Sequence, residues 1–305
     1  MKTIDLGHVG LKASAVALGV MRITKLDRAG ATKLLEAAHD AGINFFDNAD
    51  IYDGGKSETL FGQALRDANF NREDVLVQSK VGIVPGKRYD FSKEHILEAV
   101  DGSLSRLGVD YLDTLLLHRP DALMEPEEVA EAFDTLQASG KVRHFGVSNF
   151  NPMEVELLKK AVKQPLVANQ LQLSVMHTGM LDNGIHVNMA DDRSVDHDGS
   201  IYQYSRLHDM TIQAWSPFQY GFFEGVFIDN PKFPKLNASL KQLADEYHTN
   251  TSAIAAAWLL RIPDVQVIAG TTNAKRIADI AEAGDITLTR QQWYDVYFAA
   301  GNDLP

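Results

Sequence analysis

The strongest constraint on the fold is a regular alternation of short apolar runs with amphipathic segments along the 305 residues. Short apolar runs are typical of parallel strands covered on both faces, and 3.6-residue periods are typical of the helices that cover them. Eight strands are predicted, at Ala15–Leu18, Ile43–Asp47, Val75–Lys80, Leu112–His118, Val142–Val147, Leu166–Gln170, Thr211–Trp215 and Val265–Ile268. This pattern predicts an α/β fold, a (β/α)8 TIM barrel, as a single domain over residues 1–305.

The segments between the strands carry helical periods and start signals. Helices are predicted at Ala29–Ala41, Lys93–Leu107, Pro126–Ala138, Pro152–Val162, Asn237–Tyr247, Ser252–Arg261 and Ala274–Ala283, and another follows Ser57. Ser57, Ser92, Asn151 and Asn273 are predicted N-caps. Met1–Ser14 reads as a β-hairpin. The alternative, a doubly wound open sheet, would bind a dinucleotide through a G-x-G-x-x-G turn after its first strand, and the chain has no such turn.

Two strand-to-helix connections are long, Leu171–Asp209 and Ser216–Leu236. In a barrel such loops build the face at the carboxyl ends of the strands, so a pocket is expected there. The tail Thr289–Pro305 contains a short helical run, which is expected to pack across the outside of the barrel or over its mouth.

Several predicted strands end in a polar residue, although burial of an apolar side chain there would cost less free energy. These residues are Asp47, Lys80, His118 and Gln170, and Tyr52 lies on the loop just after Asp47. Strand ends converge at the mouth of a barrel, so these side chains are expected to meet. A phenol is a weak acid, with a pKa of about 10, unless a nearby cation favours the phenolate. We therefore expect Lys80 to acidify Tyr52, Asp47 to hold Lys80, and a neutral His118 to bind a substrate oxygen, a set suited to carbonyl reduction with general acid catalysis.

Two stretches resemble the signatures of the aldo-keto reductases. They are GINFFDNADIYDGGKSETLFG, which ends at Gly62, and GKVRHFGVSNF, over Gly140–Phe150. The resemblance is closest to bacterial oxidoreductases of that superfamily and spans nearly the whole chain. It implies that Asp47, Tyr52, Lys80 and His118 form a catalytic tetrad.

The resemblance also implies that NADP(H) binds on the barrel without a Rossmann domain. Ser148, Asn149 and Gln170 would hold the nicotinamide carboxamide, and Trp215 would stack on the ring, although many relatives have Tyr there. The other implied cofactor residues are Gly19, Met21, Arg22, Asp47, Ser216, Pro217, Phe218, Gly270, Thr271, Thr272, Arg276 and Asp279. Arg276 suits the 2′-phosphate of NADP. Gly270 and Ile280 replace a common Lys and a common Asn, so use of NAD(H) stays open.

Composition limits the partners. A net charge of −12 argues against nucleic acid or an anionic membrane, and no apolar run is long enough to span a bilayer, so a cytoplasmic protein acting on a small-molecule carbonyl substrate is expected. There is no cysteine, and the His and Asp residues of Met176–Gly199 match no metal pattern, so no metal is expected and this segment is interpreted as a solvated lid beside the pocket. No feature indicates an oligomeric state.

A second class of function is compatible with the same residues. The chain also resembles the channel-associated β subunits of the superfamily, which implies a regulatory or partner protein that binds NADP with little turnover. The residues expected near the mouth are Met21, Ile51, Tyr52, His118, Met176, Tyr220 and Phe222. They indicate a partly aromatic pocket without identifying the substrate.

Overall fold

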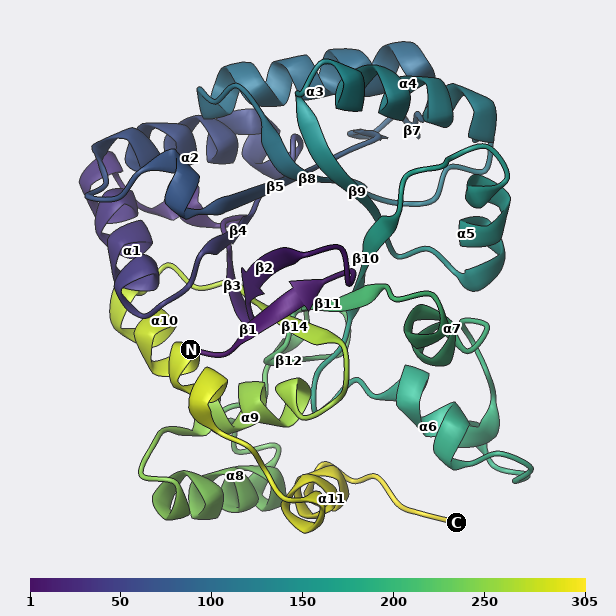
Figure 1. Cartoon of the computed structure of the whole chain (residues 1–305). Helices are drawn as coiled ribbons and strands as arrows, with labels where there is room; N and C mark the ends of the chain where they lie inside the picture. Colours follow the sequence, from purple (N-terminus) through teal and green to yellow (C-terminus); the bar gives the residue numbers. More distant parts are fainter.

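The computed structural model describes residues 1–305, and eight parallel strands close into a barrel (Figure 1). Around the ring, hydrogen-bonded neighbours follow the order β10-β11-β14-β3-β4-β5-β8-β9. These strands are β3 (Val16–Gly19), β4 (Phe45–Asp47), β5 (Leu76–Val81), β8 (Leu112–Leu117), β9 (Val142–Ser148), β10 (Leu166–Gln172), β11 (Thr211–Trp215) and β14 (Val265–Ala269). All eight predicted strands are present, and the predicted barrel is confirmed.

Helices surround the barrel, as the amphipathic periods predicted. They are α1 (Arg28–Asp40), α2 (Lys56–Asp67), α3 (Lys93–Leu107), α4 (Pro126–Ala138), α5 (Pro152–Lys159), α6 (Gly179–Ile185), α7 (Ile201–Leu207), α8 (Pro234–Glu246), α9 (Thr251–Leu260), α10 (Ala274–Ala281) and α11 (Arg290–Ala299). Ser92, Asn151 and Asn273 cap α3, α5 and α10 as predicted. The predicted cap at Ser57 is wrong, because Ser57 lies inside α2. The helix begins at Lys56 with Gly55 as its N-cap, and the Gly55 φ of 88° is one that only glycine adopts easily.

The predicted N-terminal hairpin closes one end of the barrel. It consists of β1 (Thr3–Leu6) and β2 (Leu11–Ser14), and Figure 1 shows it crossing the barrel in front of the strands. Its buried side chains join a small apolar cluster inside the barrel, made of Leu6, Ala13, Ala17, Phe45, Val167, Ala168 and Ile268. Because β3 starts directly after this hairpin, the closed end is the amino-terminal end of the strands, and the carboxyl ends lie at the opposite mouth.

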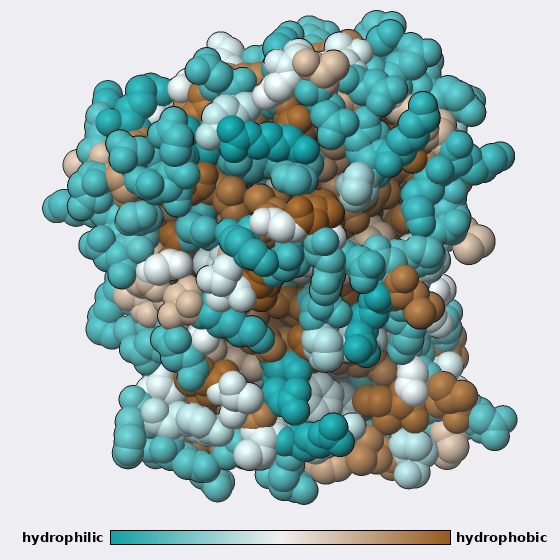
Figure 2. Space-filling model, viewed as in Figure 1, coloured by the Kyte–Doolittle hydropathy of each residue, from teal (hydrophilic) through white to brown (hydrophobic).

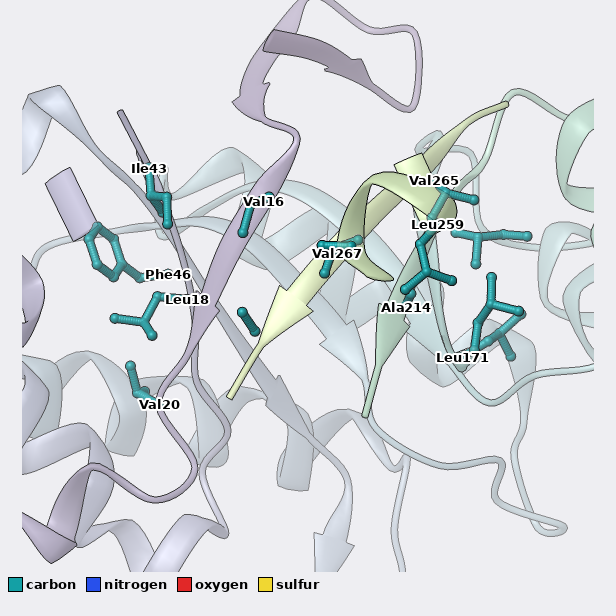
Figure 3. Close-up of a cluster of buried hydrophobic side chains, with 14 of the residues drawn as sticks. Val16, Leu18, Val20, Ile43, Phe46, Leu171, Ala214, Leu259, Val265 and Val267 are labelled. Carbon is teal, nitrogen blue, oxygen red and sulfur yellow. The ribbon is translucent and has the colours of Figure 1, made fainter. Parts of the chain in front are cut away.

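The main hydrophobic core lies between the strands and the helices. Val16 and Leu18 on β3, and Val265 and Val267 on β14, belong to this outer cluster (Figure 3). Ala17, which alternates with them, faces the small cluster inside the barrel. The period of two along each strand therefore separates an apolar outer face from the barrel interior.

The two long connections contain structure of their own. Helices α6 and α7 lie within Leu171–Asp209, and a hairpin of β12 (Gln219–Tyr220) and β13 (Gly225–Val226) lies within Ser216–Leu236. A third small hairpin, β6 (Ile83–Val84) with β7 (Arg88–Tyr89), follows β5. None of the helices is both long and apolar enough to cross a membrane. The face seen in Figure 2 is largely hydrophilic, with hydrophobic side chains gathered in the recesses between elements.

The interpretation of Met176–Gly199 as a lid is wrong. No residue of this segment lines the large cavity described below. Instead, Arg193 binds the C-terminal tail through Gly301 O at 2.9 Å and Asp303 at 3.0 Å, and Asp182 on α6 accepts a hydrogen bond from Tyr297 on α11 at 2.7 Å. The segment is thereby fastened along the outside of the barrel, where Figure 1 places α6 and the C-terminus on the same side.

Close contact between α2 and α3 yields a stability prediction. A Cβ added to Gly62 would lie 2.1 Å from the carbonyl oxygen of Leu107, which is backbone and cannot move aside easily. Gly62→Ala is expected to lower the free energy of unfolding by about 1–3 kcal/mol, although alanine is the better helix former. Gly179→Ala is the matched control, because its Cβ meets open space. Chemical denaturation measures both, and equal effects would contradict the close contact.

Candidate active site

The largest described cavity, of about 740 Å³, opens among residues that follow the carboxyl ends of the barrel strands. Sixteen of the nineteen residues predicted for the site line it: Gly19, Met21, Arg22, Asp47, Tyr52, His118, Ser148, Asn149, Gln170, Trp215, Ser216, Pro217, Phe218, Gly270, Thr271 and Arg276. The positions chosen from strand ends therefore do converge in space.

Three predicted site residues do not line the cavity. Lys80 lies directly behind its wall, in contact with Asp47 and Tyr52. Thr272 is not part of the lining, and Asp279 is paired with Lys275 at 2.7 Å on the surface of α10. An adenine contact by Asp279 would have to break this pair.

The expected mouth residues need a similar correction. Met21, Ile51, Tyr52 and His118 line the cavity, whereas Met176, Tyr220 and Phe222 do not. Sequence reasoning missed other lining residues, among them Ile83, Arg119, Phe223 and Asp229. The arginine that directly follows His118 was a visible signal, because it too lies at the end of a barrel strand. The loop residues gave no comparable signal.

A buried lysine is the centre of the polar cluster. The side chain of Lys80 is fully buried, and its Nζ lies 2.7 Å from Asp47 Oδ1, 2.7 Å from Asn48 O and 3.1 Å from the hydroxyl of Tyr52. Burial lowers the pKa of Lys80, but the charge of Asp47, together with Tyr52, outweighs this effect and raises it overall. Lys80 is therefore an ammonium ion at neutral pH.

The phenol of Tyr52 differs from the expectation in one respect. Burial raises its pKa, the charge of Lys80 lowers it, and the charge of Asp47 raises it again, so that the net shift is upward from 10.0. Lys80 thus limits the rise in the pKa but does not make the phenol acidic. Tyr52 accordingly carries its proton throughout the neutral range and can donate it.

His118 completes the group at the cavity wall. Its ring centroid lies 6.0 Å from that of Tyr52, edge to face. Burial, with the positive charges of Lys80 and Arg119, lowers the pKa of His118 well below its usual value, so the imidazole is neutral as expected. Its Nδ1 is buried without a hydrogen-bond partner in the protein. A neutral ring has one N–H, which is thus available to an oxygen in the cavity.

Two further acidic residues, Glu58 and Asp50, interact with one another near the site. Glu58 is fully buried and accepts hydrogen bonds from Ser79 at 2.6 Å and from Arg106 at 2.8 Å. Asp50 lies nearby, and one of its carboxylate oxygens is buried without a partner. Burial, then the charge of Glu58, raises the pKa of Asp50 to about 7. Asp50 is therefore the carboxyl near the site that titrates around neutrality.

Other residues of the cavity wall suit a dinucleotide. The indole N–H of Trp215 donates to Asn149 Oδ1 at 3.2 Å, and Asn149 donates to Ser148 Oγ at 2.8 Å. Near the start of α10, the guanidinium of Arg276 lines the cavity, and Asn273 caps the helix by accepting from the Arg276 backbone N–H at 2.9 Å. The first N–H groups of a helix and an adjacent arginine form an anion-binding arrangement.

Comparisons with known proteins agree with this fold. The sequence pattern of the aldo/keto reductase family matches residues 15–297. The 6-dehydroglucose reductase of Novosphingobium aromaticivorans is 36% identical over 314 residues, covering 99% of this chain and 96% of that protein. The chain therefore belongs to the aldo/keto reductase family. It is an NAD(P)H-dependent oxidoreductase.

Two further proteins show the breadth of the similarity. An aldo-keto reductase from Klebsiella pneumoniae, solved in complex with NADPH, aligns with a TM-score of 0.77 at 24% identity, covering 97% of this chain and 93% of that one. A probable voltage-gated potassium channel subunit beta of Oryza sativa is 30% identical over 315 residues, covering 94% of this chain and 92% of that protein.

The raised pKa of Asp50 yields a stability prediction. The folded state binds this proton more tightly than the unfolded state. The free energy of unfolding therefore falls as the pH rises from 3.8, the ordinary pKa of an aspartate, toward about 7, the pKa of Asp50 in the folded protein. Asp50→Asn removes the buried charge. It is expected to raise the free energy of unfolding by about 1–3 kcal/mol near pH 8, and by much less near pH 5.

Asp53→Asn is the matched control for this measurement. Asp53 lies on the same loop, but its side chain is 46% exposed. Its replacement is expected to have little effect at either pH. Denaturant titrations of the three proteins at both pH values measure the difference, and a gain for Asp50→Asn that does not depend on pH would contradict the assignment.

Proposed function

We propose that the protein reduces an aldehyde or ketone to an alcohol with NADPH, and that Tyr52 is the proton donor. The observation that carries the proposal is the continuous contact from Asp47 through Lys80 to the Tyr52 hydroxyl, at 2.7 Å and 3.1 Å, which ends beside His118 at the cavity wall. This places a protonated phenol, a supporting cation and a neutral imidazole around one point.

The roles of these residues follow from their charges. Bound NADPH would supply the hydride that the carbonyl carbon accepts. His118 and Tyr52 hold the carbonyl oxygen by hydrogen bonds, and the phenol gives its proton to that oxygen as negative charge develops there. Lys80 stabilises the phenolate that is left, and Asp47 keeps Lys80 charged and in position. Proton transfer from solvent then restores the phenol.

The residues of the cavity fit NADP(H). Trp215 offers an aromatic face, and Ser148, Asn149 and Gln170 offer polar groups at the carboxamide position. Arg276 has no carboxylate partner among the ion pairs of the protein, so its guanidinium N–H groups are free to bind a 2′-phosphate. The Klebsiella relative was solved with NADPH, which supports the same cofactor here.

Replacement of Tyr52 by Phe tests the reaction. Loss of a general acid is expected to lower kcat for NADPH oxidation about 10²–10⁴-fold. NADPH binding should be unchanged, as measured by quenching of tryptophan fluorescence. Wild-type rates in Tyr52→Phe on aldehydes and ketones would refute Tyr52 as the donor.

The same measurements distinguish carbonyl reduction from the alternative function, that of an NADP-binding regulatory or partner protein with little turnover. It predicts tight NADPH binding with equally slow oxidation by wild type and Tyr52→Phe on a panel of aldehydes, ketones and dicarbonyls. The similarity to a potassium channel β subunit is the observation that keeps this alternative in view. A rate difference between the two proteins excludes it.

Replacement of Arg276 by Gln tests the cofactor. Loss of charge-assisted hydrogen bonds to the 2′-phosphate is expected to weaken NADPH binding about 10–100-fold while NADH binding changes little. Lys275→Gln is the matched control, because Lys275 is a neighbouring cation that is paired with Asp279 and does not line the cavity. Isothermal titration with both cofactors measures the effect, and an equal loss for NADPH and NADH would contradict 2′-phosphate recognition.

A further inference from the structure

Arg119 is an uncompensated cation in the cavity wall. It directly follows His118 and lines the cavity, and its guanidinium lies 5.9 Å from the ring centroid of Trp215. The nearest acid in sequence, Asp121, is already used, because it accepts hydrogen bonds from the backbone of Phe91 at 3.1 Å and of Leu123 at 2.9 Å. The guanidinium N–H groups of Arg119 therefore have no carboxylate partner in the protein.

The ring of strands places Arg119 away from the expected cofactor phosphates. Arg119 follows β8, which is the fourth neighbour of β14 in either direction around the eight-stranded barrel. The end of β14 leads to Thr271 and to Arg276 on α10. Arg119 thus stands across the mouth from the residues that suit the dinucleotide phosphates, on the side of Tyr52 and His118.

The remaining wall on that side gives a substrate little charge to bind. Ile51 and Ile83 are apolar, and the carboxylate of Asp47 is neutralised by Lys80 at 2.7 Å. Asp229, the other acid of the lining, belongs to the loop after β11. Apart from the Lys80–Asp47 pair, a substrate carbonyl held at Tyr52 therefore has one charged side chain on this side of the cavity, and that side chain is positive.

We propose that Arg119 binds an anionic group of the substrate, and that the substrate class is short aldehydes or ketones bearing a carboxylate or a phosphate. The guanidinium fork matches either group by two parallel hydrogen bonds. Because Arg119 is adjacent to His118, the acid group lies a short distance from the carbonyl that His118 holds. This inference rests on the proposed function of the same cavity, and it makes Arg119 a specificity-determining residue.

Matched substrate pairs test the proposal kinetically. The pairs are 4-oxobutanoate with butanal for a carboxylate, and glyceraldehyde 3-phosphate with glyceraldehyde for a phosphate. Wild type is expected to have at least a tenfold higher kcat/KM for the charged member of one pair, and the preferred pair identifies the acid group. Arg119→Gln should raise KM for that charged substrate about 10–100-fold and leave the neutral substrate unchanged, whereas Arg119→Lys should lose less.

Arg88→Gln is the matched control. Arg88 lies on the small hairpin after β5, is paired with Asp90 at 2.8 Å and does not line the cavity. It should retain the wild-type preference. Equal kcat/KM for charged and neutral members in wild type would overturn the proposal while leaving carbonyl reduction intact, and so would an equal loss on both members in Arg119→Gln.

A binding measurement decides the question without turnover. Isothermal titration of 4-hydroxybutanoate, and separately of glycerol 3-phosphate, into the NADP⁺-saturated protein is expected to show binding of one ligand that weakens about 10–100-fold in Arg119→Gln and not in Arg88→Gln. Absence of binding of both ligands to wild type would overturn the anion site. Binding with no aldehyde reduction would instead support the site and refute the proposed reaction.

Discussion

The buried ion pair of Lys80 and Asp47 is the interaction on which the candidate site depends. An ammonium group with no exposed surface is tolerated only with partners on all its donors, and removal of one partner of such a pair typically costs about 3–5 kcal/mol. Asp47, at the end of β4, and Asn48 and Tyr52, on the loop that follows, supply those partners. The loop therefore takes its shape around Lys80, and the same contact that satisfies the lysine positions the phenol.

Asp47 is in turn held by amides inside the barrel. The Nε2 atoms of Gln78 and Gln170 donate to Asp47 Oδ1 at 2.7 Å and 3.1 Å, and both also contact Gln213. Gln213 donates to Gln266, which reaches Ser14 O at the closed end of the barrel. These neutral amides donate hydrogen bonds to the carboxylate without adding charge. The barrel interior thus stabilises an ion pair at its mouth, while the apolar cluster lies at the closed end.

Local patterns predicted the strands and the tetrad because each signal lay within one short segment. A polar residue at the end of an apolar run indicates a strand end, and strand ends of a barrel converge. The central Gln213 and Gln266 carried a weaker signal, a single amide in an apolar run. The lid was wrong because Arg193 and Asp182 contact the tail more than 100 residues away, and no local pattern contains such pairings. Likewise, the net pKa of Tyr52 depends on how deeply the folded chain buries it.

Trp215, where many relatives have Tyr, also has contacts that the sequence alone does not reveal. An indole donates from the edge of its ring, and here that N–H reaches Asn149 Oδ1 at 3.2 Å. Asn149 has a φ of 61°, a left-handed backbone in which asparagine is among the few tolerated residues, and its amide also donates to Ser148. Ser148 donates to Gln170 O at 3.0 Å. Trp215 is thus connected through Asn149 and Ser148 to β10, whose Gln170 side chain binds Asp47. One connected set of hydrogen bonds therefore orients both its aromatic face and the tetrad.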